Sequence, residues 1–207
     1  MSFILVWEKS GEQVKVFDNI IPKKQQEEIK KFIYERNFPW YFTADISYEY
    51  NKHQTRPGHF HLFVNHGKKN SDYVSKIKKI SDNVNKKIKK KLQMYHVRSF
   101  LQLPLNEKLI YKNNKHKEDT PHLDLDIPHT VFLYYVNDAD GDTVIYDYVS
   151  KNMKDIPNYE DVKIMKKIRP KQGRVLVFDG MTWHSSTQPT KGPRCIINFD
   201  MVWDLTI

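Results

Sequence analysis

The sequence predicts a mainly β fold, a sandwich or jelly roll, with helices only in its first half. After about residue 94 the chain contains seven short segments that are rich in β-branched and aromatic residues. Turn-forming pairs such as Asp140-Gly141 separate several of them, and no helical pattern lies between them. Successive strands without intervening helices are typical of two antiparallel sheets that pack face to face. The expected strands cover residues 95–103, 130–136, 141–149, 161–168, 173–179, 181–186 and 194–203.

The first half of the chain mixes short strands with helices. Residues 3–20 are expected to form a hairpin, and residues 22–36 an amphipathic helix that Pro22 opens. A second helix is expected from Ser71, as its N-cap, to about Leu92, because apolar residues recur there at three- and four-residue steps. We expect both helices to pack on one of the two sheets.

Length and composition favour one packed domain that spans residues 1–207. The chain is 39% hydrophobic and 13% aromatic, which is enough to fill one interior. The apolar run at residues 3–7 is too short for a membrane span or a signal-peptide core, so we expect no membrane association and no export. Cys195 is the only cysteine and cannot form an internal disulfide. The expected location is therefore the cytoplasm.

The formal net charge of +9 raises the question of a nucleic-acid partner. Only six of the 34 basic residues are Arg, although Arg is the side chain best suited to bidentate contact with phosphate. Many of the lysines fall on the polar face of the helix expected at residues 71–92. A solvated helix face is the favoured interpretation, and a nucleic-acid surface is the alternative.

A candidate metal site begins at His122. Side chains alternate along a strand, so His122, Asp124 and Asp126 are expected to share one face of the segment "HLDLD". The spacing alone is weak evidence, because it also occurs at His116-Lys117-Glu118 in a polar loop. A third ligand is available in His184 on a later strand. Two histidines and one carboxylate with open positions suit non-haem Fe(II), and the ligands alone leave Zn²⁺ as an alternative.

Arg194 follows His184 by ten residues and opens the last expected strand. Its planar guanidinium could hold a carboxylate through two parallel hydrogen bonds. An H-x-D pair, a distal His and this Arg form a more specific pattern together than any of them does alone.

In this order, these residues resemble the Fe(II)/2-oxoglutarate-dependent oxygenases, and the prolyl-hydroxylase-like branch in particular. The segments "TVFLYYVNDADGDTVIYD" and "KQGRVLVFDGMTWHSS" carry the likeness, which covers residues 94–203. "VFDNIIPKKQQEEI" and "FPWYF" resemble more loosely the short oxygenases of marine bacteriophages. The resemblance implies a double-stranded β-helix, a cupin-like jelly roll, at residues 94–207, with residues 1–93 as a helix-containing support.

The resemblance also implies roles for individual residues. His122, Asp124 and His184 would bind Fe(II), and Arg194 would hold the distal carboxylate of the cosubstrate 2-oxoglutarate. Dioxygen would be the second cosubstrate, and ascorbate a stimulant. Tyr135 and Tyr111 match positions near the cosubstrate.

One position departs from the family pattern. Ile196 stands where the family often has a Ser that helps to hold the carboxylate. Tyr111 or Tyr135 would have to supply the missing hydroxyl.

The implied reaction is the hydroxylation of a second substrate coupled to the decarboxylation of 2-oxoglutarate. A prolyl or other residue of a peptide or protein is favoured as that substrate, with Asp126 on the substrate side of the metal. The alternatives are a nucleic-acid-modifying, AlkB-like oxygenase and a non-catalytic β-sandwich binding protein. A phage-encoded enzyme would act in the host cytoplasm, and the sequence indicates no oligomeric state.

Overall fold

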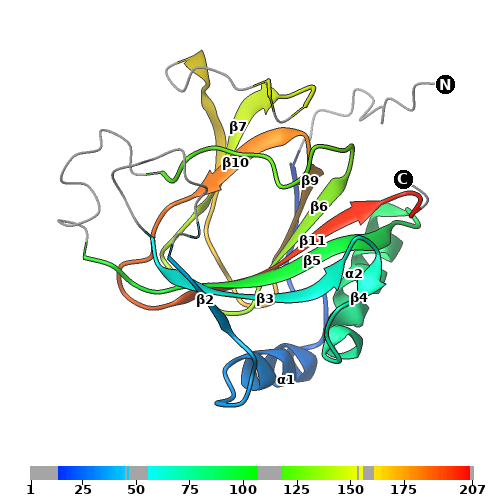
Figure 1. Ribbon diagram of the computed structural model, residues 1–207, viewed down its shortest axis with the longest axis vertical. Helices are drawn as coiled ribbons and strands as arrows, with labels where there is room; N and C mark the ends of the chain where they lie inside the picture. Colours follow the sequence, from blue (N-terminus) through cyan, green and yellow to red (C-terminus); the bar gives the residue numbers. More distant parts are fainter. Residues whose placement is uncertain are drawn as a thin grey trace.

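Two antiparallel sheets face each other in the computed structural model, and two helices cover the outer side of the larger sheet (Figure 1). The structure describes residues 14–44, 46, 56–106, 118–152, 154–155 and 161–205. The first strand of the hairpin expected at residues 3–20 and the expected cosubstrate residue Tyr111 lie outside the described residues.

The larger sheet has the strand order β1-β9-β6-β11-β5-β3-β2, and a short eighth strand, β4, pairs with β3. The strand β11 lies in the middle of the sheet, antiparallel to β5 on one side and to β6 on the other. The strands are β1 (Val14–Phe17), β2 (Tyr41–Thr43), β3 (Gly58–Asn65), β4 (Lys68–Lys69), β5 (Gln93–Gln102), β6 (Thr130–Tyr135), β9 (Val175–Asp179) and β11 (Arg194–Val202).

The smaller sheet has the order β10-β7-β8 and consists of β7 (Thr143–Val149), β8 (Ile164–Ile168) and β10 (Thr182–Ser186). All seven strands that the sequence predicts after residue 94 are therefore present, and the jelly-roll prediction is confirmed. The first half does more than support this core. Strands β1 to β4 belong to the larger sheet, where β3 pairs with β5 along most of its length.

The two predicted helices are present as α1 (Lys23–Ile33) and α2 (Val74–Ile88). The second helix is shorter than expected at both ends. Ser71 does not cap it, because its hydroxyl pairs with His61 and accepts a hydrogen bond from the Tyr73 N–H at 3.2 Å. At the other end Lys89 adopts a left-handed conformation, with φ of 56°, and stops the helix before Leu92.

The strand β11 shows how the layers are divided. Its odd-numbered residues, such as Cys195 and Ile197, pack in one apolar cluster with the buried faces of α1 and α2. Even-numbered residues face the other way, where Ile196 packs with Leu133 in the cluster between the sheets. Alternation along a single buried strand thus places one set of side chains under the helices and the other set between the sheets. Two polar residues of the second set, Arg194 and Asn198, line the pocket of the candidate site.

Candidate active site

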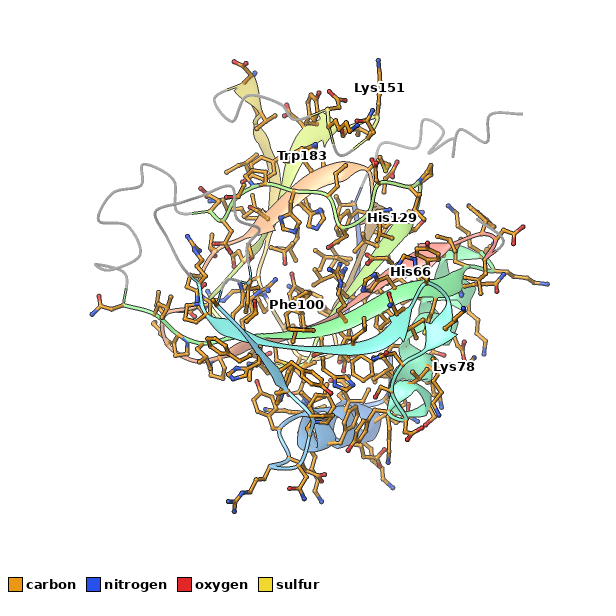
Figure 2. All side chains as sticks on the ribbon, in the orientation of Figure 1. His66, Lys78, Phe100, His129, Lys151 and Trp183 are labelled. Carbon is orange, nitrogen blue, oxygen red and sulfur yellow. The ribbon has the colours of Figure 1, made fainter. Side chains whose placement is uncertain are left out.

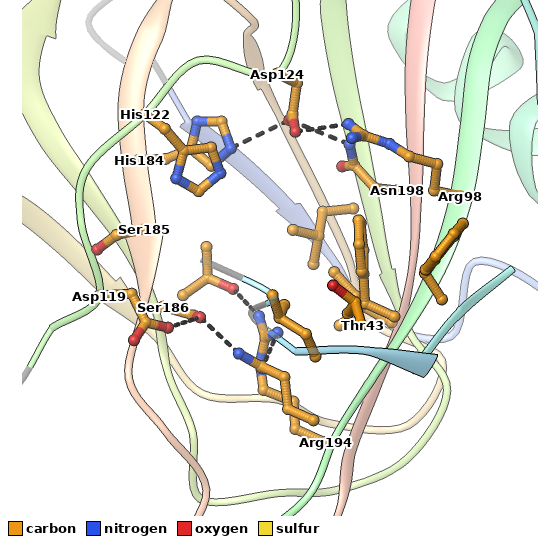
Figure 3. A pocket seen from close by; sticks show the side chains of 17 residues that line it. Thr43, Arg98, Asp119, His122, Asp124, His184, Ser185, Ser186, Arg194 and Asn198 are labelled. Atoms are coloured by element: carbon orange, nitrogen blue, oxygen red, sulfur yellow. Dashed lines mark hydrogen bonds and ion pairs between the residues drawn. The ribbon is translucent and has the colours of Figure 1, made fainter. Parts of the chain in front are cut away.

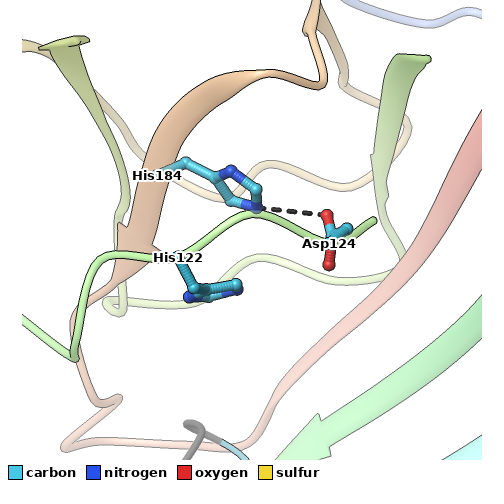
Figure 4. A group of neighbouring side chains, drawn as sticks. All are labelled: His122, Asp124 and His184. Atoms are coloured by element: carbon cyan, nitrogen blue, oxygen red, sulfur yellow. Dashed lines mark ion pairs between the residues drawn. The ribbon is translucent and has the colours of Figure 1, made fainter. Parts of the chain in front are cut away.

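The backbone brings His122 and His184 side by side. His184 lies on β10, and the segment before residue 124 runs antiparallel to that strand, with an isolated bridge between the two histidines. Each backbone N–H donates to the other's carbonyl, at 2.9 and 3.2 Å, and the ring centroids are 4.7 Å apart. Both side chains project to the same side of this pair (Figure 4).

Hydrogen bonds fix the orientation of both rings. The Nδ1 atom of His122 donates to the Thr120 carbonyl at 3.0 Å, and Nδ1 of His184 donates to the Thr182 carbonyl at 3.1 Å. A carbonyl oxygen can only accept, so the Nδ1 atoms carry the protons and the Nε2 atoms are the candidate coordinating atoms. This arrangement is the usual support of metal-binding histidines.

Asp124 completes a group of three candidate ligands. One atom from each of His122, Asp124 and His184 lies within 4.8 Å of the other two. The carboxylate Oδ2 of Asp124 is 3.1 Å from Nε2 of His184. A cation placed among two imidazole nitrogens and a carboxylate would meet the donor set that suits non-haem Fe(II), so the residues fit that metal.

The segment that carries Asp124 is not the regular strand that the sequence predicts. Among the described residues, this segment forms bridges at Glu118 and His122, and no strand follows until Thr130. Strand alternation therefore does not extend to Asp126, which is exposed and lies outside the pocket lining. The expectation that Asp126 lies on the substrate side of the metal is wrong for this reason.

Burial and neighbouring charges set the protonation states of the three groups. Burial, together with the positive charge of His184, lowers the pKa of His122 to about 4, which keeps that ring neutral and able to coordinate. Burial would raise the pKa of Asp124, but His184 and Arg98 hold it well below its usual range. Burial opposes the charge of His184, yet the charge and hydrogen bond of Asp124 outweigh it and raise the pKa of His184. A metal ion would take the place of the proton that His184 shares with Asp124.

Arg194 lies at the other end of the same pocket and is 3% exposed. Its Nε donates to the Gly141 carbonyl at 2.9 Å, Nη1 to Oε1 of Gln102 at 2.7 Å and Nη2 to the Thr143 hydroxyl at 2.8 Å. These bonds use three of its five N–H donors. The guanidinium is therefore fixed in place and still has donors for a ligand.

One pocket of about 220 Å³ joins the three candidate ligands to Arg194 (Figure 3). Its volume is below the roughly 300–1,000 Å³ of sites for drug-sized ligands, so it suits a small molecule. Near Arg194 the wall is polar, because the Ser186 hydroxyl accepts from Gln102 at 3.1 Å and donates to Asp119 at 2.7 Å. The apolar part of the wall consists of Ile46, Phe60, Phe100, Leu133 and Ile196.

Tyr135 does not line this pocket, contrary to the expected contact with a cosubstrate. It is fully buried, and its hydroxyl donates to the Thr143 hydroxyl at 2.7 Å. Its ring lies beside the Arg194 guanidinium, 5.8 Å from the ring centroid to Cζ. Tyr135 thus supports Arg194 and Thr143 from behind. The hydroxyl-bearing residues that line the pocket are Thr43, Thr143, Ser185 and Ser186.

Several residues of the pocket have no counterpart in the sequence prediction: Arg98, Gln102, Thr143, Ser186 and Asn198. One of them carried a usable signal. Asn198 has the same strand parity as Arg194, so alternation places both on one face. Gln102 and Arg98 are the cross-strand partners of Arg194 and Asn198, but this pairing of β5 with β11 depends on a register that the sequence alone does not reveal.

Together, these features define a double-stranded β-helix with two histidines, one aspartate and a buried arginine around one pocket. Solved structures with this fold are similar across most of the chain. A 2OG-Fe(II) oxygenase family oxidoreductase from Burkholderia pseudomallei has a TM-score of 0.65 and 10% identity, over 93% of this chain and 86% of that one. A Trichoplax adhaerens prolyl hydroxylase, in complex with a hypoxia inducible factor peptide fragment, has a TM-score of 0.59 and 14% identity, over 93% and 84%.

A third similar structure is the viral collagen prolyl hydroxylase of Paramecium Bursaria Chlorella virus-1 in its 2OG complex. It has a TM-score of 0.52 and 14% identity, and the match covers 92% of this chain and 96% of that one. At such identities the likeness shows the fold alone. No protein-family model matches the sequence, and no curated protein matches it. Within the described residues, neither helix is long and apolar enough to cross a membrane.

Proposed function

We propose that this chain is an Fe(II)- and 2-oxoglutarate-dependent dioxygenase that hydroxylates a prolyl or other residue of a peptide or protein. The main support for the proposal is that one small pocket contains His122, Asp124 and His184 at one end. The fixed guanidinium of Arg194 lies at the other end of this pocket. A binding protein without chemistry has no evident use for this combination. Similar structures include one described as a complex with 2OG.

One end of the pocket would bind the metal, and the other end would bind the cosubstrate carboxylate. His122, Asp124 and His184 would hold the iron through two Nε2 atoms and a carboxylate oxygen. Arg194 would bind the distal carboxylate of 2-oxoglutarate with its remaining N–H donors. The Thr143 hydroxyl would assist, because it accepts from Tyr135 and Arg194 and keeps its own proton to donate. The Thr143 hydroxyl would take the place of the Ser that is absent at Ile196, because Thr143 lines the same pocket from β7.

Iron bound there would supply the oxidative chemistry, in which 2-oxoglutarate, dioxygen and a C–H bond give succinate, carbon dioxide and a C–OH group. The chain provides binding, orientation and exclusion of water. Phe60, Phe100 and Ile196 form an apolar wall beside the ligands, which limits the access of water. The lowered pKa of His122 keeps its ring neutral at pH 7, which is the form of an imidazole that binds a metal.

The distribution of charge supports a peptide over a nucleic acid. Lys-rich helix α2 packs on the outer side of the larger sheet, whereas the pocket opens on the inner side. Figure 2 shows Lys78 on that outer helix and Phe100 on the inner side of the sheet. A nucleic acid bound along α2 would therefore lie away from the metal ligands. One similar structure is described as holding a peptide.

The proposal is tested with anaerobic protein, Fe(II) and 2-oxoglutarate. A visible charge-transfer band is expected on mixing, followed by succinate when air is admitted. His122→Ala is the control, and it should give neither signal because one imidazole ligand is missing. Folded wild-type protein that produces no band and no succinate would contradict the proposal.

A further inference from the structure

A second polar cluster lies directly behind Asp124, between the two sheets. It consists of Arg98 on β5 and of Asn198 and Asp200 on β11. Arg98 and Asn198 are cross-strand partners, and Asp200 follows Asn198 on the same face. Asp200 is completely buried. A buried carboxylate is costly unless it is paired, so its partners are informative.

The side chains of Arg98 and Asn198 each contact both carboxylates, those of Asp124 and Asp200. Arg98 Nη2 lies 2.8 Å from Oδ1 of Asp124 and 3.3 Å from Oδ2 of Asp200. The Asn198 Nδ2 group donates to Oδ2 of Asp124 at 3.1 Å and to Oδ1 of Asp200 at 2.9 Å. Figure 3 shows the Arg98 and Asn198 side chains converging on Asp124 from the side opposite the histidines. Asp124 is thus held at both of its oxygens.

The two oxygens of Asp124 have different surroundings. Oδ2 is the atom that lies 3.1 Å from Nε2 of His184, on the side of the histidines. Oδ1 is engaged by the guanidinium of Arg98, which is itself tied to Asp200. An oxygen in an ion pair with a guanidinium is poorly placed to bind a second cation, because the two positive charges would repel each other.

We propose that Arg98, anchored by the buried Asp200, restricts Asp124 to a single metal-binding oxygen, Oδ2. Arg98 and Asp200 are positioning residues that act through Asp124. The inference rests on the proposed function, because it concerns the same candidate metal site. It implies that the metal keeps a position for 2-oxoglutarate that a carboxylate bound through both oxygens would occupy.

Asp200 also has an electrostatic role, because it compensates the positive charge of Arg98. A divalent ion bound to Asp124 would lie close to the positive charge of Arg98. Asp200 offsets that charge from the far side of the guanidinium, so its removal should weaken metal binding. His129 Nε2 lies 3.8 Å from Oδ1 of Asp200, and this histidine forms a second group of candidate ligands with Asp124 and Asp200. The guanidinium of Arg98 pairs with both carboxylates of that group, Asp124 and Asp200. Its positive charge therefore takes the place that a cation would have there.

The test uses Co(II) in place of iron, because its visible absorption reports the number of coordinating atoms. Metal-free wild type and the Arg98→Gln variant are titrated with Co(II), and 2-oxoglutarate is then added. With Oδ1 released, Arg98→Gln should show the weaker absorption of a higher coordination number. Its affinity for 2-oxoglutarate should fall about tenfold. Arg174→Gln is the matched control, since Arg174 pairs with Asp18 on the surface.

Asp200→Asn tests the anchor with little change of shape. Loss of a supporting partner of this kind typically lowers metal affinity by roughly 10–100-fold, and we expect a rise of that size in the Kd for Co(II). Asp82→Asn, on the exposed side of α2, is the control and should bind as the wild type does. If Arg98→Gln does not fold, Arg98→Lys keeps the buried charge but not the two-carboxylate contact. It should also alter the Co(II) spectrum.

The outcomes separate the two proposals. Wild-type protein that binds Co(II) no better than His122→Ala would overturn the metal site and the proposed function. A wild-type site that depends on His122, combined with an unchanged Co(II) spectrum in the folded Arg98 variant, would overturn the role of Arg98 alone. An unchanged Kd in Asp200→Asn would in the same way overturn the role of Asp200.

Discussion

Arg194 is the residue whose surroundings most narrow the choice of ligand. It is buried, and three acceptors from β5, β7 and the turn before β7 fix its orientation. A fixed guanidinium with donors left over matches the geometry of a carboxylate. The same pocket contains the candidate metal ligands at its other end. A small molecule with a carboxylate at one end and metal-binding oxygens at the other would satisfy both ends.

Replacing Arg194 by Lys should weaken the binding of 2-oxoglutarate without affecting the metal. The ammonium keeps the charge but loses the planar pair of donors. Hydrogen bonds to charged groups contribute about 1.5–3 kcal/mol, so the KM for 2-oxoglutarate should rise roughly 10–100-fold. Steady-state succinate formation measures the KM, and Co(II) titration checks the metal site. An unchanged KM would show that Arg194 does not hold the cosubstrate.

The sequence could predict part of the site because its main residues are set by local patterns. His122, Asp124, His184 and Arg194 were all expected, and the structure brings the four to one pocket. Asp126 was misplaced, because strand alternation was extended past the point where the chain leaves β10. Arg98 and Asp200 were missed since their contacts depend on the pairing of β5 with β11 and on the position of Asp124 above both strands.

Among the elements, β3 and α2 are joined through His61. This histidine is buried against Phe38 and Phe63, with ring centroids 4.6 Å away in both cases. Its Nδ1 donates to the Pro39 carbonyl at 2.9 Å, and its Nε2 lies 2.9 Å from the Ser71 hydroxyl before α2. Burial lowers the pKa of His61, so the neutral ring is the form that the fold stabilises. This histidine is a component of the core on the helix side of the sheet.

The contact of His61 predicts a pH dependence of stability. The folded-state pKa is below the value of about 6.5 expected in the unfolded chain, so the unfolded state binds the proton more readily. The stabilisation is present above that pH and is lost as the pH falls through the lower folded value. The urea midpoint of the wild type should therefore decrease between about pH 7 and pH 5.

His61→Gln should be less stable than wild type at pH 7.5, and the difference should shrink toward pH 5. The glutamine can still form hydrogen bonds but does not take up a proton. His66→Gln, at an exposed position of the turn after β3, is the matched control. A difference between His61→Gln and wild type that is constant over this pH range would contradict this role of His61.

The strands were easier to predict than the ends of the helices. Short β-rich segments between turn residues located all seven later strands, because turn residues mark their boundaries even where the strand is exposed, as in β8. The extent of α2 was overestimated, since tertiary contacts decide both ends. Ser71 pairs with His61 instead of capping the helix, and the Leu92 N–H bonds to the Asn85 side chain at 3.2 Å.

On the scale of the whole molecule, the larger sheet separates two surfaces with different properties. The helices and their lysines cover its outer side, and the pocket lies on its inner side (Figure 1). The net charge of +9 therefore need not act on the substrate of the pocket. The sequence reveals the net positive charge, but it does not reveal that the lysines of α2 lie on the side of the sheet away from the pocket. Their position depends on how α2 packs against the sheet, which is a tertiary property.

Reversing charge on α2 tests this separation. The double change Lys86→Glu and Lys87→Glu, at two exposed positions, should leave the rate of succinate formation within about twofold of wild type, because charges in water beyond about 10 Å are largely screened. Fluorescence anisotropy with random-sequence DNA over a salt series is the companion measurement. Tight, salt-dependent binding that this double change abolishes together with turnover would favour a nucleic-acid substrate instead.

The most direct test of the central claim follows an oxygen atom. Purified protein is supplied with Fe(II), 2-oxoglutarate, ascorbate as reductant and ¹⁸O₂, and the succinate is analysed by mass spectrometry. Wild-type protein should form succinate that carries one ¹⁸O atom, and His184→Ala should form none above the level produced by free iron. Labelled succinate at equal rates from both proteins, or none from folded wild type, would contradict the central claim.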